Sequence, residues 1–229
     1  MSNCEQCIIR QLNSLKELTK DELIRISHCK TSQLIKRGDV IFEEGDYING
    51  VFCVKSGVCK VSKMSDNGKD QIIHLIQKGD LLGERSLISD EVANLKATAI
   101  NDMEVCFIPK EEILKDLQDN HDFTMSMMQR MASSLKNADN VIVDMAQKPV
   151  RQRLAQMLLF LHEKFGETHT GALAINLSRD DMASIIGTAT ESAIRLLSTF
   201  KKEDLIAIKG KAIHIVNLTV LKTVAQGLE

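Results

Sequence analysis

Hydrophobic residues change their spacing along the chain, and these changes divide it into segments of different predicted structure. Between residues 8 and 29 the spacing is helical, and Thr19 with Glu22 three residues later is typical of a helix N-cap. From about residue 33 to Pro109, short runs of Val, Ile, Leu and Phe alternate with glycine-containing turns. This texture predicts an antiparallel sandwich or barrel. Asn67-Gly68 predicts a hairpin turn within it, because both central positions of a type I′ turn need positive φ.

The pattern becomes helical again after Pro109. Residues 111–117 predict a short helix, and a longer one follows in which apolar residues are three or four positions apart. That spacing is close to a coiled-coil seam, although the same face could instead pack on its own domain. We expect a dimerisation helix with this seam: Phe123, Met127, Met131, Leu135, Ala138, Ile142 and Met145.

Lys148-Pro149 interrupts the helical pattern, and residues 146–149 are expected to form a hinge between domains. Proline is tolerated in the first turn of a helix, so the next helix is expected from Pro149 to Phe165.

Residues 177–197, LSRDDMASIIGTATESAIRLL, predict two short helices joined by a tight turn. Ser178 with Asp181 forms one capping box, and Thr188 with Glu191 forms a second. Gly187 stands where the first helix ends, since a left-handed residue there costs glycine little. A second helix with polar side chains at its first turns is typical of a helix-turn-helix that reads the DNA major groove. An ordinary helical hairpin is the alternative.

The residues after this hairpin predict a small basic β-hairpin. LIAIKGKAIHIV, residues 205–216, reads as two strands around Lys209-Gly210-Lys211, and basic residues at such a tip suit DNA phosphates. Residues 150–229 carry 10 Lys and Arg against 8 Asp and Glu, whereas residues 1–149 carry 19 against 23. This asymmetry is small, and its sign fits a C-terminal nucleic-acid module.

Composition narrows the class of protein. The 229 residues are 44% hydrophobic and 26% charged, which is typical of a soluble protein with one large or two modest domains. Long apolar runs are absent, and the N-terminus lacks the regions of a secretory signal. We therefore expect a cytoplasmic protein with no membrane partner. Its six cysteines are then expected to be thiols or ligands rather than disulfides.

The order of these segments resembles the CRP/FNR family of bacterial transcription regulators over nearly the whole chain. The resemblance is carried by GD at 38–39 and 79–80, LLGE at 81–84, RQRLAQML at 151–158, residues 177–197, and IKGKAIHI at 208–215. CEQCIIRQL at 4–12 and EVCFIP at 104–109 are most similar to the FNR branch.

This resemblance implies an α+β fold in three parts. An N-terminal antiparallel β-roll of the cyclic-nucleotide-binding type, with N-terminal helices, takes residues 1–117. The dimerisation helix takes residues 118–146, and a winged helix-turn-helix takes residues 147–229.

The resemblance also implies which residues read DNA. Glu191 and Arg195 match the recognition-helix motif E-[ST]-x-x-R. The chemistry agrees, because glutamate can accept from cytosine N4 and arginine can donate to guanine O6 and N7. Thr190 and Ile194 depart from the family's pattern, so a TTGA- or TGA-type half-site is implied with its outer bases open. The predicted DNA-contacting residues are Ser178, Arg179, Thr190, Glu191, Ser192, Arg195, Lys209 and Lys211.

The implied function is a homodimeric, sequence-specific transcription regulator on a two-fold operator of double-stranded DNA. RNA polymerase is its implied protein partner, and the roll is the implied sensor of a redox or small-molecule signal.

The signal itself is left open. Gly83 and Glu84 match the family's cyclic-nucleotide cassette and are candidate effector-pocket residues, but the Arg-Ser that should follow falls on Ala93-Asn94. Lys96 is the nearby basic residue, but its ammonium group cannot make the two parallel hydrogen bonds that an arginine makes to a phosphate. Cyclic AMP is therefore not expected.

Cysteines suggest a different signal. Cys4, Cys7 and Cys106 match three of the four cysteines that hold an iron–sulfur cluster in the FNR branch, and Asn13 stands near the place of the missing one. A cluster, another thiol-based or small-molecule signal, and no effector all remain open. The alternative is that Cys53, Cys59 and Cys106 are small buried strand residues, as free cysteines usually are, and that Cys4 and Cys7 lie in a frayed terminus.

Two rival functions fit less well. A metal oxygenase built on the roll needs two or three histidines and a carboxylate on one metal, and the sequence has no H-x-H with a downstream Glu, so no enzyme is expected. A cyclic-nucleotide-binding module that acts on a protein partner without reading DNA would leave the recognition helix unexplained.

Overall fold

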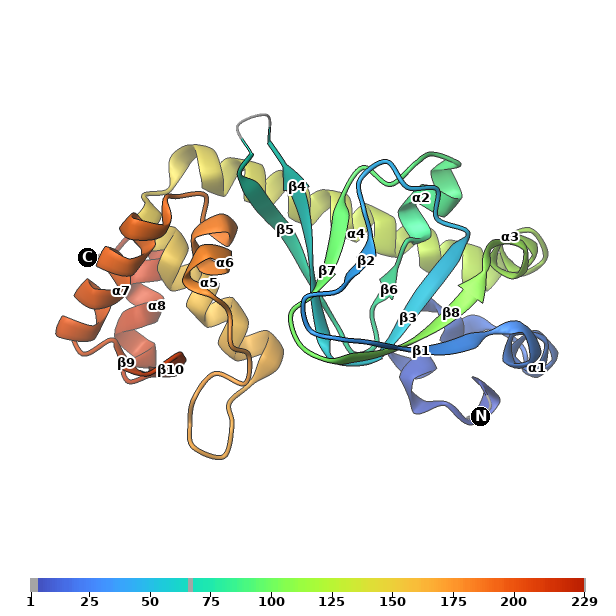
Figure 1. Cartoon of the computed structure of the whole chain (residues 1–229), viewed down its shortest axis with the longest axis horizontal. Helices are drawn as coiled ribbons and strands as arrows, with labels where there is room; N and C mark the ends of the chain where they lie inside the picture. The colour runs from blue at the N-terminus through green and yellow to red at the C-terminus, as the bar shows by residue number, and fades with distance from the viewer. Residues whose placement is uncertain (1–3, 66–67, 229) are drawn as a thin grey trace. The chain divides into compact units, whose positions relative to one another are not determined.

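The structure, a computed structural model, describes residues 4–65 and 68–228 and divides into two compact units, with the boundary between Lys136 and Asn137 (Figure 1). The first unit begins with 3₁₀ helices η1 (Cys4–Gln6), η2 (Ile8–Leu12) and η3 (Ser14–Glu17) and helix α1 (Lys20–Cys29). The predicted N-cap of α1 is confirmed: the Glu22 backbone N–H donates to Thr19 Oγ1, and the Thr19 N–H donates to the Glu22 carboxylate.

Two four-stranded antiparallel sheets follow, as predicted from the alternation of short apolar runs with glycine-containing turns. One sheet has the order β1-β8-β3-β6 and the other β2-β7-β4-β5. Their bounds are β1 (Thr31–Ile35), β2 (Val40–Phe42), β3 (Gly50–Ser56), β4 (Val58–Met64), β5 (Asp70–Gln77), β6 (Leu81–Leu82), β7 (Lys96–Ala99) and β8 (Met103–Pro109). Strands β4 and β5 pair on either side of the predicted Asn67-Gly68 turn, of which Asn67 lies outside the described residues.

Side chains along β3 and β8 point alternately to the two faces of the first sheet, and both faces are covered by other parts of the unit. Val54 and Val105 point into a core shared with the second sheet. Their neighbours Cys53 and Cys106 point the opposite way, into a core formed with the N-terminal helices. Successive side chains of a strand point to opposite faces, so the two cysteines belong to the N-terminal side of the sheet.

Helices close the first unit. Helix α2 (Glu84–Ser89) lies between β6 and β7, and α3 (Lys110–Asp119) and α4 (His121–Gln147) follow β8. Asn120 fixes the start of α4, because its Oδ1 accepts from the Phe123 N–H at 2.9 Å.

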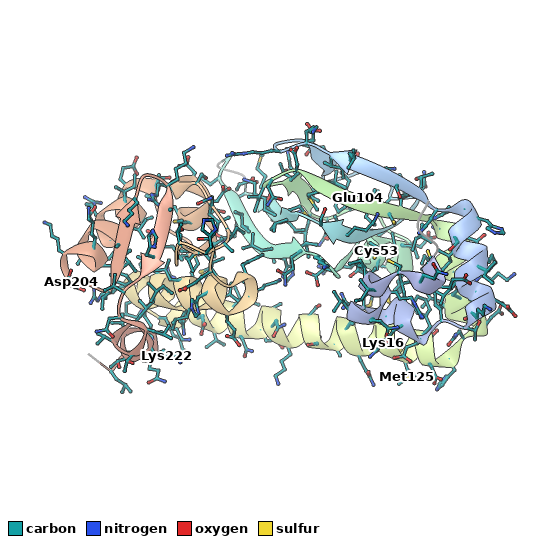
Figure 2. All side chains as sticks on the ribbon, turned by 90° about the horizontal axis from the view of Figure 1, so that it is seen from below. Lys16, Cys53, Glu104, Met125, Asp204 and Lys222 are labelled. Carbon is teal, nitrogen blue, oxygen red and sulfur yellow. The ribbon has the colours of Figure 1, made fainter. Side chains whose placement is uncertain are left out.

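The predicted seam of α4 is wrong at its beginning. Phe123 and Met127 are 0% and 2% exposed because they are buried in the core beneath the N-terminal helices. They pack on their own domain, the alternative that the spacing left open. Further along, Leu135 and Ile142 are 65% and 66% exposed, and Met131, Ala138 and Met145 are half-buried. Figure 2 shows Cys53 within the roll and Met125 on the outer side of α4.

The second unit contains the end of α4 and the C-terminal elements. Helix α4 ends at Gln147 and α5 begins directly after Pro149, so the break between the helices lies at Lys148-Pro149. The hinge at residues 146–149 stays a prediction, since the boundary between the two compact units lies earlier, within α4. The bounds are α5 (Val150–Phe165), α6 (Arg179–Ile185), α7 (Thr190–Lys202), β9 (Ile206–Lys209), β10 (Ala212–Ile215) and α8 (Leu218–Gln226).

Within the described residues, the search for a helix long and apolar enough to cross a membrane finds none.

Candidate nucleic-acid interface and cysteine-lined cavity

Helices α6 and α7 form the predicted helix-turn-helix. The capping box of α6 is confirmed: Ser178 Oγ accepts from the Asp181 N–H at 3.0 Å, and the Asp181 carboxylate accepts from the Ser178 N–H at 3.2 Å. Gly187 has φ +62°, the left-handed conformation expected after the first helix. These two local signals fix where α6 begins and ends.

The predicted second capping box, at Thr188 and Glu191, is wrong. Helix α7 begins at Thr190, and its N-cap is Ala189, whose side chain cannot cap. Thr188 instead closes α6: its N–H donates to Ala183 O at 3.0 Å, while the Gly187 N–H donates to Ser184 O at 3.3 Å. This pair of bonds is a Schellman motif, which takes Thr188 into the end of the first helix.

One face of α7 is buried and the other carries the predicted reading residues. Ala193, Leu197 and Phe200 are buried, as predicted from the helical spacing. Glu191 and Arg195 are exposed on the opposite side, near the start of the helix. A helix in the major groove contacts bases with residues at this position.

The other predicted contact residues of the helix-turn-helix make internal bonds. Thr190 Oγ1 donates to Asp180 Oδ1 at 2.7 Å and so joins α7 to α6. Ser192 Oγ accepts from the Arg195 guanidinium at 3.3 Å. Arg179 is half-buried with its Nη1 3.4 Å from Met182 Sδ, and burial lowers the pKa of its guanidinium.

Strands β9 and β10 form the predicted basic wing. They pair antiparallel with Lys209 opposite Ala212, and Gly210 between them has φ +62°. Lys209 and Lys211 are exposed at the tip. The tip therefore presents two ammonium groups to solvent, which suits contact with phosphate.

Arg153 on α5 is a structural residue that the sequence did not single out. Its Nε donates to Ile186 O at 2.8 Å, in the turn of the helix-turn-helix. Its Nη1 donates to Met145 O at 3.0 Å and Lys148 O at 2.8 Å, at the end of α4. One planar guanidinium thus connects the end of α4 to the helix-turn-helix, because its donors point in several fixed directions.

The predicted effector-pocket residues lie at the start of α2. Gly83 has φ +93°, and Glu84, the next residue and the first of α2, is half-buried. Burial raises the pKa of the Glu84 carboxyl to about 7, while Arg130 acts in the opposite direction. Where the cyclic-nucleotide cassette would place its arginine, Ala93 is buried, and Lys96 forms an ion pair with Glu43 at 2.9 Å.

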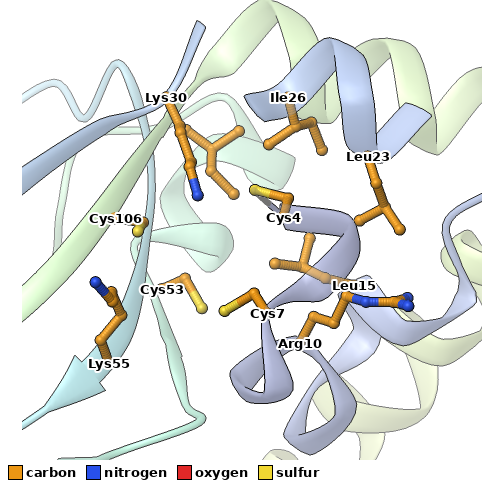
Figure 3. A pocket seen from close by; sticks show the side chains of 11 residues that line it. Cys4, Cys7, Arg10, Leu15, Leu23, Ile26, Lys30, Cys53, Lys55 and Cys106 are labelled. Carbon is orange, nitrogen blue, oxygen red and sulfur yellow. The ribbon is translucent and has the colours of Figure 1, made fainter. Parts of the chain in front are cut away.

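A small cavity in the first unit brings four cysteines together. It is lined by Cys4, Cys7, Cys53 and Cys106 with Arg10, Lys30, Lys55 and apolar residues (Figure 3). Three of these are the cysteines singled out in the sequence. The fourth, Cys53, could be found only once the pairing of β3 with β8 was known, because the two cysteines are 53 positions apart along the chain.

Asn13 lies beside this cavity and is nearly inaccessible to solvent. Its Nδ2 is 3.4 Å from Cys53 Sγ and also donates to Gly79 O at 3.0 Å. Its Oδ1 accepts from the Leu15 N–H at 3.0 Å. The amide is therefore committed to structural bonds, one of which places an N–H group against the Cys53 sulfur.

A β-roll followed by a winged helix-turn-helix defines a class of protein: a DNA-binding regulator with a sensor-type domain. Family models agree for both parts. The cyclic nucleotide-binding domain matches residues 32–120, and the Crp-like helix-turn-helix domain matches residues 152–224. The chain belongs to the CRP/FNR family of transcription regulators.

Curated relatives align over most of the chain. The chain is 29% identical to the fumarate and nitrate reduction regulatory protein of Vibrio cholerae over 229 aligned residues, covering 97% of this chain and 90% of that protein. It is 25% identical to the transcriptional activator protein Anr of Pseudomonas protegens, covering 99% and 93%. The first of these relatives is named as a regulatory protein and the second as a transcriptional activator.

Solved structures share the fold. A regulator of this family from Eubacterium rectale superposes with a TM-score of 0.77 at 20% identity, covering 93% of this chain and 97% of that one. FixK2 from Bradyrhizobium japonicum superposes with a TM-score of 0.77 at 22% identity, covering 85% and 96%.

Proposed function

We propose that this transcription regulator binds a two-fold symmetric operator as a homodimer, with α7 of each subunit in a major groove. The observation that carries the proposal is the polarity of α7. Glu191 and Arg195 are exposed near the first turns, whereas Ala193 and Leu197 are buried behind them. The carboxylate is suited to accept from cytosine, and the guanidinium is suited to donate to guanine.

The exposed part of α4 supports dimerisation. Met128, Leu135 and Ile142 are all exposed and lie seven residues apart. Half-buried Met131, Ala138 and Met145 follow each of them by three positions. This is the a and d pattern of a two-stranded coiled coil. The proposed seam therefore runs from Met128 to Met145 and omits Phe123 and Met127.

The wing and the capped start of α6 supply the proposed phosphate contacts. Lys209 and Lys211 are exposed at the wing tip, and Ser178 is exposed at the start of α6. Arg179 and Ser192 complete the proposed contacts at the edge of the groove. Such contacts fix the register of the protein on DNA and carry little sequence information.

The roll is the proposed sensor, for a redox or small-molecule signal. A signal that favours one arrangement of the two helix-turn-helix units would change operator affinity, because it would raise the fraction of dimers in that arrangement. RNA polymerase is the proposed protein partner at the promoter.

Selection of bound sequences from a random DNA pool tests this function, with and without oxygen. We expect enrichment of a palindrome with half-sites about 10 base pairs apart, centre to centre. Enrichment of a single unpaired half-site, or of no sequence, contradicts the proposal.

A further inference from the structure

We propose that Ile194 of helix α7 is a specificity-determining residue that contacts the 5-methyl group of a thymine in the operator half-site. The inference rests on the proposed function, in which α7 lies in the major groove. It deepens that function, because it assigns a base contact to a side chain that cannot form hydrogen bonds and names the base.

Ile194 interrupts the polar outer face of α7. The exposed residues of this helix, all of whose residues the structure describes, are Glu191, Ile194, Arg195, Ser198, Lys201 and Lys202. Ile194 is the apolar side chain among them, and it is 45% exposed. Isoleucine is a weaker helix former than alanine or leucine, so helix stability does not explain its presence here. Its apolar surface is available for a contact outside the chain.

Ile194 lies among the residues that are proposed to contact bases. Glu191 precedes it by three positions, and Arg195 is the next residue. Side chains three or four positions apart are neighbours on one face of a helix, so Glu191, Ile194 and Ser198 share a row. A single exposed isoleucine is ordinary on a protein surface. This one stands between a carboxylate and a guanidinium proposed to contact bases, so it enters the groove together with them.

Hydroxyl groups close to Ile194 form hydrogen bonds within the protein. Ser198 Oγ donates to Ile194 O at 3.0 Å, and Thr190 Oγ1 donates to Asp180 Oδ1 at 2.7 Å. The protons of these two hydroxyls are therefore committed to acceptors in the helix-turn-helix. A base pair that faces Ile194 meets an apolar surface rather than a further donor.

The thymine methyl is the apolar group that unmodified bases present in the major groove, where the other features of their edges are hydrogen-bond donors and acceptors. A hydrocarbon side chain against such a donor or acceptor removes its water without replacing the hydrogen bond, which costs free energy. Against a methyl group, the same side chain buries apolar surface on both partners, which is favourable. Ile194 therefore favours thymine over the other bases.

The helix geometry limits where this thymine lies. An α-helix advances about 5.4 Å per turn, and B-DNA advances about 3.4 Å per base pair. Glu191 and Ile194 are less than one turn apart, so they face bases no more than about two pairs apart. Branching at Cβ also leaves isoleucine in a helix with one strongly preferred χ1 rotamer, so little conformational freedom is lost on contact. We expect the thymine within about two base pairs of the G·C pair assigned to Glu191 and Arg195.

The test uses the operator obtained by selection from random DNA, with each thymine of one half-site replaced in turn by deoxyuridine. Uracil pairs as thymine does and lacks the 5-methyl group, so each replacement removes one methyl. Fluorescence anisotropy measures the affinity of the full-length wild type, Ile194→Ala and Val220→Ala for each duplex. Val220→Ala is the matched control, because it shortens an apolar side chain of similar exposure, 43%, on α8.

We expect one thymine at which deoxyuridine weakens binding by the wild type about fourfold, the effect of losing one buried methyl group. Val220→Ala should show the same loss. Ile194→Ala should bind the thymine operator roughly three- to tenfold more weakly than the wild type and no longer distinguish thymine from uracil at that position. Its affinity for scrambled DNA should be unchanged. Urea unfolding should show no loss of stability, because Ile194 is exposed and alanine is the better helix former.

The outcomes separate this inference from the proposed function. A wild type that selects a palindrome but binds every deoxyuridine duplex as tightly as the thymine operator overturns the methyl contact and leaves the DNA-binding function standing. An Ile194→Ala variant that keeps the fourfold loss assigns the methyl contact to another side chain and also overturns the inference. The same holds for a selected half-site with no thymine within about two base pairs of its guanine. A wild type that selects no sequence overturns both proposals.

Discussion

The amide of Asn13 donates toward the sulfur of Cys53 across 3.4 Å, and the two residues are 40 positions apart in the chain. The contact connects the segment between η2 and η3 to strand β3. The same amide group also donates to Gly79 O at 3.0 Å, so one buried side chain attaches the N-terminal segment both to β3 and to the turn before β6.

Ser178→Ala is expected to lower the free energy of unfolding by about 1 kcal/mol. The substitution removes the acceptor for the Asp181 N–H, one of the donors left unsatisfied at the start of α6. Thr188→Ala is the matched control, since the Thr188 backbone N–H, rather than its hydroxyl, makes the Schellman bond. Urea unfolding followed by circular dichroism measures both. A larger loss for Thr188→Ala would mean that the second capping box forms in solution.

Stability is expected to fall as pH rises between about 5 and 8. Burial raises the pKa of Glu84 from 4.5 to about 7. A carboxyl whose folded pKa is raised stabilises the fold while protonated, so this contribution is lost as pH rises through the folded pKa. Asp80 adds to the upward shift, and Arg130 opposes it.

Glu84→Gln should flatten this dependence, which thermal unfolding at a series of pH values measures. Asp90→Asn is the control, because Lys110 lowers the pKa of that exposed carboxyl and its titration falls below this range. An unchanged slope in Glu84→Gln would mean that Glu84 titrates normally.

Local signals predicted local structure. Ser178 and Asp181 are three residues apart, so their capping box is visible in the sequence and is present in the structure. Thr188 followed by Glu191 has a similar signature, yet the backbone of Thr188 closes the preceding helix. Two signals overlapped in five residues, and the Schellman motif around Gly187 prevailed.

Contacts between residues that are far apart in the chain could not be predicted from the sequence pattern. The apolar spacing of α4 is continuous, but only its first part is covered by the N-terminal helices, so Phe123 is core and Leu135 is exposed. Likewise, Cys53 and Cys106 become neighbours only through the register of β3 and β8. Periodicity predicts which face is apolar, but what covers that face depends on non-local packing.

Leu135→Glu is expected to dissociate the dimer. The substitution removes a leucine from each chain of the proposed seam, at about 1.5–3 kcal/mol each. Two such losses raise the dissociation constant by roughly 10²–10⁴-fold. Ser133→Glu, two positions earlier on the exposed part of α4, adds the same charge outside the seam. Sedimentation equilibrium separates the two, and a dimer of unchanged affinity in Leu135→Glu would remove α4 from the interface.

Arg195→Ala and Lys211→Ala are expected to affect DNA binding in different ways. Arg195 is proposed to donate to a guanine, so its loss should weaken the selected operator by about 1–3 kcal/mol while changing random DNA little. Lys211 is proposed to contact phosphate, so its loss should weaken all sequences alike. The slope of log affinity against log salt should also become shallower by about one per lysine removed.

Fluorescence anisotropy on operator and scrambled duplexes at several salt concentrations measures both effects. Lys202→Ala is the charge-matched control, because this exposed residue lies in the last turn of α7, away from the proposed base contacts. Retained discrimination in Arg195→Ala would mean that α7 does not read bases through this residue. Loss of discrimination in Lys211→Ala would assign base reading to the wing instead, where a lysine in the minor groove could distinguish narrow A·T-rich segments.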